Sequence, residues 1–349
     1  MSSNLLRSVE GDLEKTYPHT IDYSARSTWS AADLIQLSKD NPPEPIIENL
    51  LFRGDVLVLH GKEESYKSIL VVQMAESIAT GRPLLRMWNV PQPRRAGLIE
   101  TEMHATMLGK RLGQMFPDGK VPQQMLFMSD DSLKRWRRAD LPEKVSIIAE
   151  WVRSQEIEIL IIDTANDFFR GEHNPSDERH VGQLFDLLRN LSLKGVILVR
   201  HDHKKRDGDS EAHSNELIRG SAEWKEDPEA ILHIERPDKR THKAILEVGK
   251  LRYCGKPEPV EVWFDTRCFR LTPLPPVIAA LEGGRKTRQE LIKDCQIRFG
   301  IEARFTEYMI ESEERFLQSG TEGHNRTYEL HPERSLDAGW ANFLTHPST

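Results

Sequence analysis

The chain has 349 residues, of which 38% are hydrophobic and 30% charged, and this composition is typical of a folded protein with one sizeable core and a smaller domain. No apolar run approaches the ~20 residues that a membrane-spanning helix needs, and the N-terminal residues lack the pattern of a secretory signal, so we expect a cytoplasmic protein. The net charge of −7 excludes a protein that coats nucleic acid with its whole surface, and three cysteines without metal-ligand spacing argue against a disulfide framework or a zinc module.

Residues 1–45 are polar and mixed, which predicts an N-terminal arm or linker that docks on a neighbour or is partly mobile. The stretch SAADLIQLSKD within this segment predicts one short helix. Ser30 is the expected N-cap of that helix, and Pro42 follows its end.

From residue 46 to residue 274, apolar and β-branched runs alternate with amphipathic segments. The runs DVLVLH, AGLIE, EILIID, GVILVR and AILHIE each have the length and composition of a strand. Continuous apolar strands separated by helices predict a parallel sheet with helices on both faces. The expected fold class of this region is therefore α/β.

Residues 275–349 form the second predicted domain, which the proline-rich LTPLPP connects to the first. The stretches VIAALEGG, TRQELIKDCQIRFG and EARFTEYMIESEERFLQSG predict three helices, followed by a glycine-containing turn and a short strand. This order predicts a small winged-helix-like domain with a tail. DNA binding and protein docking both remain open for it, because its basic side chains suit phosphate contacts but glutamates oppose them on the third helix. These basic residues are Arg285, Lys286, Arg288, Arg298 and Arg304.

The segment LVLHGKEESYKSIL has the layout of a phosphate-binding loop. An apolar run ends at Gly61, and a predicted amphipathic helix begins at Lys67 and Ser68. Gly81 should end this helix. In such a loop, backbone N–H groups surround the phosphates, the lysine reaches the β and γ oxygens of ATP, and the hydroxyl ligates Mg²⁺. Tyr66 breaks the pattern G-x-x-x-x-G-K-[ST] at a position where glycine costs less, so a chance Lys-Ser pair is the alternative. The candidate nucleotide contacts are Gly61, Lys62, Glu63, Glu64, Ser65, Tyr66, Lys67, Ser68 and Ile69.

The segment EILIIDTANDFF supplies the second candidate element of a nucleotide site. Its apolar residues Ile159–Ile162 predict a buried strand that delivers Asp163 to the carboxyl edge of the sheet, where ligands bind in open parallel sheets. Asp163 can hold Mg²⁺ through water, together with Ser68, whereas the role of Asp167 stays open. The alternative is an aspartate that only terminates a buried strand.

These motifs occur in the same order as in one known family. Ser65–Ser68 spell S-Y-K-S, and IATGRPLL, GLIETEM, EILIID and GVILVRHDHKK follow. Residues 30–270 thereby resemble the RecA-fold hexameric ATPases related to plasmid and phage RepA helicases and, more distantly, to DnaB-type replicative helicases. Members of this group often carry S-[FY]-K-S in place of S-G-K-S. The resemblance implies a RecA-like P-loop NTPase core that uses ATP and Mg²⁺ and assembles as a homo-oligomeric ring, which we expect to be a hexamer.

The resemblance also implies roles for two strand ends. In GLIETEMHATMLGKRL it makes Glu102 the catalytic glutamate that orients the attacking water, with Glu100 as the less favoured choice. An acid that only caps the next helix is the alternative. After GVILVR, His201 becomes the γ-phosphate sensor, with Lys204 as a supporting charge. A metal site of His201 and His203 is disfavoured because no complementary ligand set stands nearby.

Two further segments are implied to face DNA or a neighbouring subunit. RDGDSEAHSNELI matches the loop that lines the central pore, for which a solvated loop is the alternative, and Arg219–Ser221 reproduce the family's R-G-S. Lys250 and Arg252 resemble the K-x-R hairpin that hexameric helicases project into the ATP site of the adjacent subunit, where the arginine neutralises charge on the transferred phosphoryl group. A strand with two solvent-facing bases is the other interpretation.

These expectations describe an ATP-dependent, ring-forming helicase or translocase. It would act on single-stranded DNA in the replication of a mobile element, with a replication initiator or primase as a possible partner and without membrane contact. One alternative is a nucleotide-switched DNA-binding loader or regulatory ATPase without unwinding activity. Another is a catalytically silent scaffold whose altered loop binds nucleotide weakly or not at all.

Overall fold

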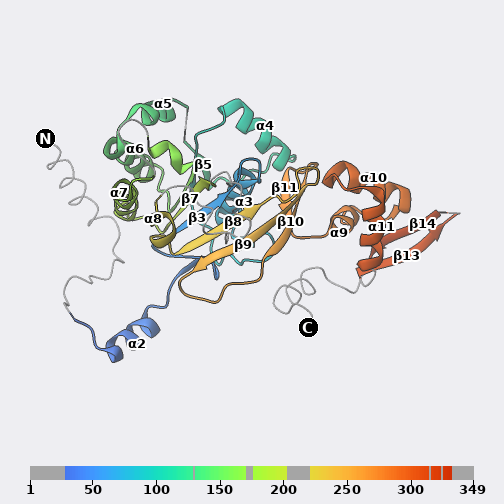
Figure 1. Ribbon diagram of the computed structural model, residues 1–349, viewed down its shortest axis with the longest axis horizontal. Helices are drawn as coiled ribbons and strands as arrows, with labels where there is room; N and C mark the ends of the chain where they lie inside the picture. Colours follow the sequence, from blue (N-terminus) through green and yellow to red (C-terminus); the bar gives the residue numbers. More distant parts are fainter. Residues whose placement is uncertain are drawn as a thin grey trace, which may run out of the picture. The chain divides into compact units, whose positions relative to one another are not determined.

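The computed structural model describes residues 28–128, 130–169, 176–202, 221–313, 316–323 and 325–331 (Figure 1). The chain divides into two units, residues 1–44 and residues 45–349. In the first unit, the predicted helix is present as α2 (Ala31–Asp40). Ser30 caps it in a capping box, because its hydroxyl accepts the N–H of Asp33 while the Asp33 carboxylate accepts the N–H of Ser30.

The second unit is built on a nine-stranded sheet with the strand order β11-β10-β9-β8-β3-β7-β6-β4-β5. The strands from β8 to β5 in this order are parallel, and β9, β10 and β11 extend the sheet antiparallel. The prediction of an α/β fold with a large, mostly parallel sheet is confirmed. The strands are β3 (Asp55–Gly61), β4 (Ala96–Glu100), β5 (Met125–Phe127), β6 (Ile159–Asp163), β7 (Gly195–His201), β8 (Ala230–Glu235), β9 (Lys243–Leu251), β10 (Val260–Asp265) and β11 (Arg270–Thr272). A short antiparallel pair, β1 (Pro45–Ile47) and β2 (Leu51–Phe52), precedes β3.

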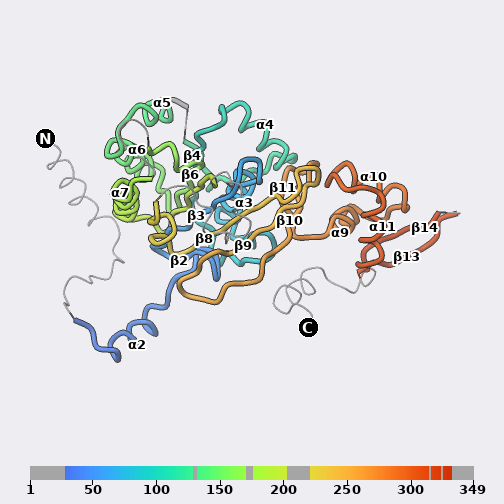
Figure 2. Tube along the Cα trace, in the orientation of Figure 1, coloured from blue at the N-terminus to red at the C-terminus, as the bar shows by residue number. Residues whose placement is uncertain are grey.

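Helices cover both faces of the sheet and enclose two hydrophobic cores (Figures 1 and 2). On one face lie α3 (Lys67–Thr80) and α4 (Ala105–Met115), and on the other lie α5 (Asp130–Arg138), α6 (Leu141–Ser154), α7 (Glu178–Arg189) and the short α8 (Glu223–Glu226). The expectation that α3 is amphipathic is wrong, because eleven of its 14 residues are buried. This helix lies inside the protein, and Gly81 ends it in the left-handed conformation, as expected. None of the described helices has both the length and the apolar character needed to cross a membrane.

The C-terminal elements form a third core with helices α9 (Pro276–Leu281), α10 (Arg288–Phe299) and α11 (Ala303–Ser312). They are completed by an antiparallel sheet of β12 (Lys286–Thr287), β14 (Asn325–Leu330) and β13 (Leu317–Glu322). The third predicted helix was too long, because the chain enters β13 before its expected end. Arg298 does not fit a phosphate contact, because its buried guanidinium pairs with Asp265 of β10.

Candidate nucleotide site

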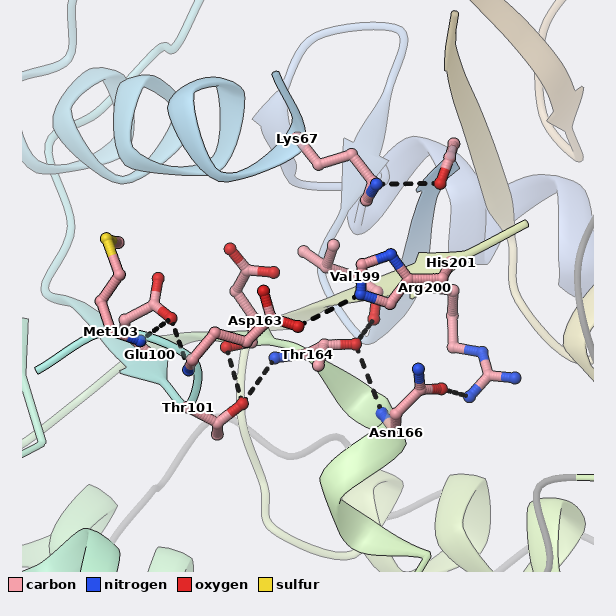
Figure 3. Close-up of polar contacts among 12 residues, drawn as sticks. Lys67, Glu100, Thr101, Met103, Asp163, Thr164, Asn166, Val199, Arg200 and His201 are labelled. Carbon is pink, nitrogen blue, oxygen red and sulfur yellow. Dashed lines mark hydrogen bonds and ion pairs between the residues drawn. The ribbon is translucent and has the colours of Figure 1, made fainter. Parts of the chain in front are cut away.

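The candidate site lies at the carboxyl edge of the parallel strands. In the sheet register, Gly61 at the end of β3 lies opposite His201 at the end of β7, and Glu100 at the end of β4 lies opposite Asp163 at the end of β6. Because parallel strands all end at one edge, motifs that are far apart in the sequence meet here. Figure 3 shows Lys67 on α3 facing this edge, with Glu100, Asp163 and His201 beyond it.

The loop between β3 and α3 has little free space at its first glycine. A Cβ atom on Gly61 would clash with the carbonyl oxygen of Ile234 and lie 2.8 Å from Ser65 Oγ, so no other residue fits. Lys67 Nζ donates to the carbonyl oxygens of Gly61, at 2.8 Å, and Lys62, at 2.6 Å. Burial of Lys67 lowers the pKa of its ammonium group, and the nearby carboxylates oppose that shift. A charged lysine held inside a loop at the start of a helix suits a phosphate ligand.

Tyr66 takes the place of the second glycine with a left-handed backbone, at a φ of 72°. That conformation costs an ordinary residue on the order of 1–2 kcal/mol. Its side chain leaves the loop and stacks on Phe264 of β10, with 4.8 Å between ring centroids. The tyrosine therefore adopts the glycine conformation while its ring packs against the antiparallel part of the sheet.

Asp163 and Ser68 lie together, as the sequence predicts. The Ser68 side chain hydrogen-bonds the Asp163 carboxylate, which is 3% exposed, and burial raises the pKa of Asp163. Among the described residues, no hydrogen-bond partner is present for Asp163 Oδ2. A hydroxyl beside a buried carboxylate with an unused oxygen fits the hard, oxygen-preferring Mg²⁺ that accompanies ATP.

The two glutamates after the β4 run differ in their surroundings. β4 ends at Glu100, which is 4% exposed and accepts the N–H groups of Glu102, at 2.8 Å, and Met103, at 3.1 Å. Burial and the neighbouring Asp163 raise the pKa of Glu100 to about 7. The Glu102 side chain is half exposed, and its Oε1 lies 3.2 Å from His201 Nε2. Lys67 and Glu102 influence each other's pKa, so their charges are close, while Glu100 accepts the N–H groups of the turn after β4.

Hydrogen bonds that sequence reasoning missed tie the strand ends together. Thr101 Oγ1 donates to the carbonyl oxygen of Asp163 at 3.1 Å and accepts the N–H of Thr164 at 3.1 Å. Thr164 Oγ1 donates in turn to the carbonyl oxygen of Val199 at 3.0 Å. Figure 3 shows these bonds crossing from β4 through β6 to β7. The sequence does contain a signal for these bonds, because Thr101 directly follows Glu100 and Thr164 directly follows Asp163.

A buried cluster of His60, Asp202 and His233 lies beside the loop and was also missed. Asp202 Oδ1 lies 2.7 Å from His60 Nδ1, and Asp202 Oδ2 lies 3.3 Å from His233 Nε2. Burial opposes ionisation of Asp202, but its hydrogen bonds with both histidines outweigh that effect and lower its pKa to about 2. One ligand atom of each residue lies within 4.8 Å of the others, so the three could hold a metal ion, and the two imidazole rings are stacked with 4.7 Å between centroids.

Lys250 and Arg252 lie away from the loop of their own chain. Leu251 pairs with Ala230, which pairs with Leu57, so this part of β9 lies toward the amino ends of the parallel strands. Lys250 Nζ donates to the carbonyl oxygens of Lys225 and Glu226, and Arg252 Nη2 donates to those of Glu226 and Asp227, at the end of α8. Lys250 is the second-last residue of β9 and Arg252 directly follows the strand, where the chain turns toward its antiparallel neighbour β10.

The predicted pore loop, residues 206–218, lies outside the described residues. His203, Lys204, Arg219 and Gly220 lie outside them as well, so the supporting charge and most of the R-G-S motif are not placed. Ser221, the last residue of that motif, is buried.

A family model described as "AAA domain" matches residues 20–208 of the chain. The RadB recombinase crystal structure is 16% identical with a TM-score of 0.43 over 64% of this chain and 92% of that one. A KaiC-like protein from the hyperthermophilic archaeon Pyrococcus horikoshii OT3 is 14% identical with a TM-score of 0.48 over 66% and 94%, respectively. A third solved structure, an ATPase domain, is 11% identical with a TM-score of 0.49 over 70% and 97%. Among curated proteins, none matches this chain.

Proposed function

The chain belongs to the AAA-domain family, and from this premise we propose that it binds Mg-ATP at the β3–α3 loop and hydrolyses it. One observation carries the proposal: Lys67 and Ser68 of the loop meet Asp163 at the carboxyl edge of the sheet, with the Ser68 hydroxyl on the carboxylate. Lys67 would contact the β and γ phosphates, and Ser68 and Asp163 would hold Mg²⁺, the aspartate through water. The bound metal would neutralise phosphate charge.

Glu102 and His201 supply the remaining chemistry in this proposal. Glu102 is ionised because the His201 hydrogen bond lowers its pKa, and an ionised carboxylate beside the lysine can orient and polarise the attacking water. His201 can report the γ-phosphate, since it contacts the same glutamate. The charge of Asp167 acts in the opposite direction and raises the pKa of Glu102, so Asp167 lies near this carboxylate.

For the assembly, we propose a homo-oligomeric ring, hexameric by resemblance, in which Lys250 and Arg252 act on the ATP of the next subunit. Their distance from their own loop supports action in trans over action in cis. In the single chain, both side chains donate to carbonyl oxygens at the end of α8, and these contacts would have to open when a neighbour's phosphate arrives.

For the substrate, we propose single-stranded DNA and helicase or translocase activity in mobile-element replication, with a replication initiator or primase as a further partner. Residues 275–349 would act as a winged-helix-like domain. Their helix–strand–helix–helix–strand–strand order supports this assignment. Ion pairs Arg285–Glu329 and Arg288–Glu307 occupy two of its basic side chains, which favours protein docking over DNA binding for this part.

The deciding experiment measures ATP turnover and particle mass with and without an ATP analogue and a single-stranded oligonucleotide. We expect turnover stimulated by the oligonucleotide and a nucleotide-dependent ring. Turnover with assembly but without strand displacement would favour the loader or regulator. Absence of nucleotide binding would support the alternative of a catalytically silent scaffold.

A further inference from the structure

The hairpin that joins β8 to β9, residues 236–242, packs against the phosphate-binding loop. At its base, Glu235 Oε1 lies 3.1 Å from Lys62 Nζ, and within it Lys239 Nζ lies 2.6 Å from Glu64 Oε2. Both ion pairs are partly exposed, so each contributes little by itself. They nevertheless place the hairpin along the outer side of the loop.

Tyr66 makes the half-buried part of this contact. Its ring stacks on the ring of Phe264, and the guanidinium of Arg236 lies over it at 5.1 Å from the ring centroid. Arg236 is fixed in turn, because its Nε donates to the carbonyl oxygen of Thr241 at 3.0 Å. The Tyr66 hydroxyl lies 3.1 Å from Nδ1 of His242, the last residue before β9. A glycine at position 66 could make none of these contacts.

His242 also reaches the end of α10. Its backbone N–H donates to the carbonyl oxygen of Phe299 at 3.2 Å, and its own carbonyl accepts the N–H of Phe264 at 2.8 Å. Gly300 ends α10 with a φ of 66°, and a Cβ atom there would lie 2.7 Å from Cδ2 of the His242 ring. The helix end and the imidazole are therefore in close contact.

A phosphate that binds the N–H groups at the start of α3 must fix the backbone of residue 66, whose carbonyl accepts the N–H groups of Ile69 and Leu70. A fixed backbone at residue 66 restricts the direction of the Tyr66 ring. The Tyr66 hydroxyl then restricts the His242 ring through their hydrogen bond. We propose that Tyr66 and His242 are positioning residues that couple nucleotide binding at the loop to the C-terminal end of α10. The coupling rests on the proposed nucleotide binding and extends it to regulation of the C-terminal elements.

Hydrogen exchange measures this coupling directly. In the full chain, saturating Mg²⁺ and a non-hydrolysable ATP analogue should slow amide exchange at residues 296–300 by about fivefold, the effect expected of one hydrogen bond. Tyr66→Phe keeps the ring but removes the hydroxyl, and His242→Ala removes its partner, so both should lose the slowing. His242→Asn should restore it, because its side chain can place a polar atom near the position of Nδ1. Tyr308→Phe removes an exposed hydroxyl from α11 and should behave as the wild type.

A double-mutant cycle without nucleotide tests the contact itself. If Tyr66→Phe and His242→Ala break the same hydrogen bond, the double variant should lose no more thermal stability than the more damaging single variant. Additive losses would show that the two side chains act independently and would overturn the proposal.

The outcomes separate this inference from the proposed function. If the wild type binds no nucleotide, both the proposed function and the coupling are wrong. A wild type that binds the analogue without slowed exchange at the end of α10 overturns only the coupling. The coupling also fails if Tyr66→Phe and His242→Ala, both saturated with the analogue in a fluorescence titration, show the full wild-type slowing.

Discussion

His201 and Glu102 are in contact at the carboxyl edge of the parallel strands, with His201 Nε2 3.2 Å from Glu102 Oε1. His201 is the last residue of β7 and Glu102 follows β4, and β6 with Asp163 lies between those strands. The end of the proposed sensor strand and the proposed catalytic carboxylate are therefore directly connected. Because they are in contact, a shift of either side chain on phosphate binding should also displace the other.

Replacing Lys67 with alanine should abolish ATP turnover. The variant removes the ammonium group that would contact the β and γ phosphates. The N–H groups of the loop backbone carry no charge and cannot replace its charge-assisted hydrogen bonds. A steady-state phosphate-release assay measures the effect. Lys110→Ala, on the exposed side of α4, is the control and should keep wild-type turnover. Normal turnover in Lys67→Ala would place the nucleotide elsewhere.

Glu102→Gln should bind ATP but hydrolyse it at least about 100-fold more slowly, because the amide keeps the shape of the side chain but lacks its basicity. Nucleotide titration and single-turnover kinetics separate the two properties. The comparator is Glu100→Gln, which changes the buried residue that holds the turn. If Glu100→Gln alone gives the trapped, ATP-bound state, the glutamate assignment is off by two residues.

Glu100 should make the metal-free, nucleotide-free protein lose stability as the pH rises. Its folded pKa of about 7 lies above the ordinary value of 4.5, so between these values the folded state binds more protons than the unfolded state. The free energy of unfolding should fall by up to ~3 kcal/mol across that window. Denaturant unfolding at several pH values should show that Glu100→Gln removes this decline.

Glu102→Gln is the control for that titration. The pKa of Glu102 is lowered, so its stabilisation is present above the ordinary value and is lost only as the pH falls. The decline between about pH 4.5 and pH 7 should therefore persist in Glu102→Gln. An equal decline in Glu100→Gln would assign it to another group.

Arg252→Ala should lower turnover by roughly 10³-fold or more if the arginine acts on the neighbouring subunit's ATP. Mixing inactive Lys67→Ala subunits with inactive Arg252→Ala subunits should restore partial activity, because some interfaces then join an intact lysine to an intact arginine. Phosphate release after subunit exchange is the measurement. Co-assembly without recovery, or normal turnover in Arg252→Ala, would argue against action in trans.

The parallel core could be predicted because its strands are uninterrupted apolar runs. DVLVLH, AGLIE, EILIID, GVILVR and AILHIE all form strands, and the residues at their carboxyl ends meet because parallel register brings them to one edge. The antiparallel extension was harder to find. KAILEVGKL alternates in burial and VEVWFD begins exposed, so neither has the signal of a strand buried on both faces.

The conformation of the loop could not be read from its pattern. The sequence marks Tyr66 as a departure from glycine, but the compensating partners, Phe264, Arg236 and His242, are about 170 to 200 residues away along the chain. The same limit applies to Glu100, whose raised pKa arises from burial next to Asp163 on another strand. Such pairings depend on the strand order, which the local sequence does not encode.

The loop with Lys67 and the segment with Lys250 and Arg252 lie toward opposite ends of the same strands. A contact that brings one to the other joins two unlike segments. In a two-fold dimer this contact would have to form twice within one patch, whereas in a head-to-tail arrangement it forms once per interface and repeats from subunit to subunit. We follow the second case. If the rotation per subunit closes, the result is a ring; if it carries a rise, the same interface winds into a helical filament. A small change in the pitch of this one interface would convert one assembly into the other.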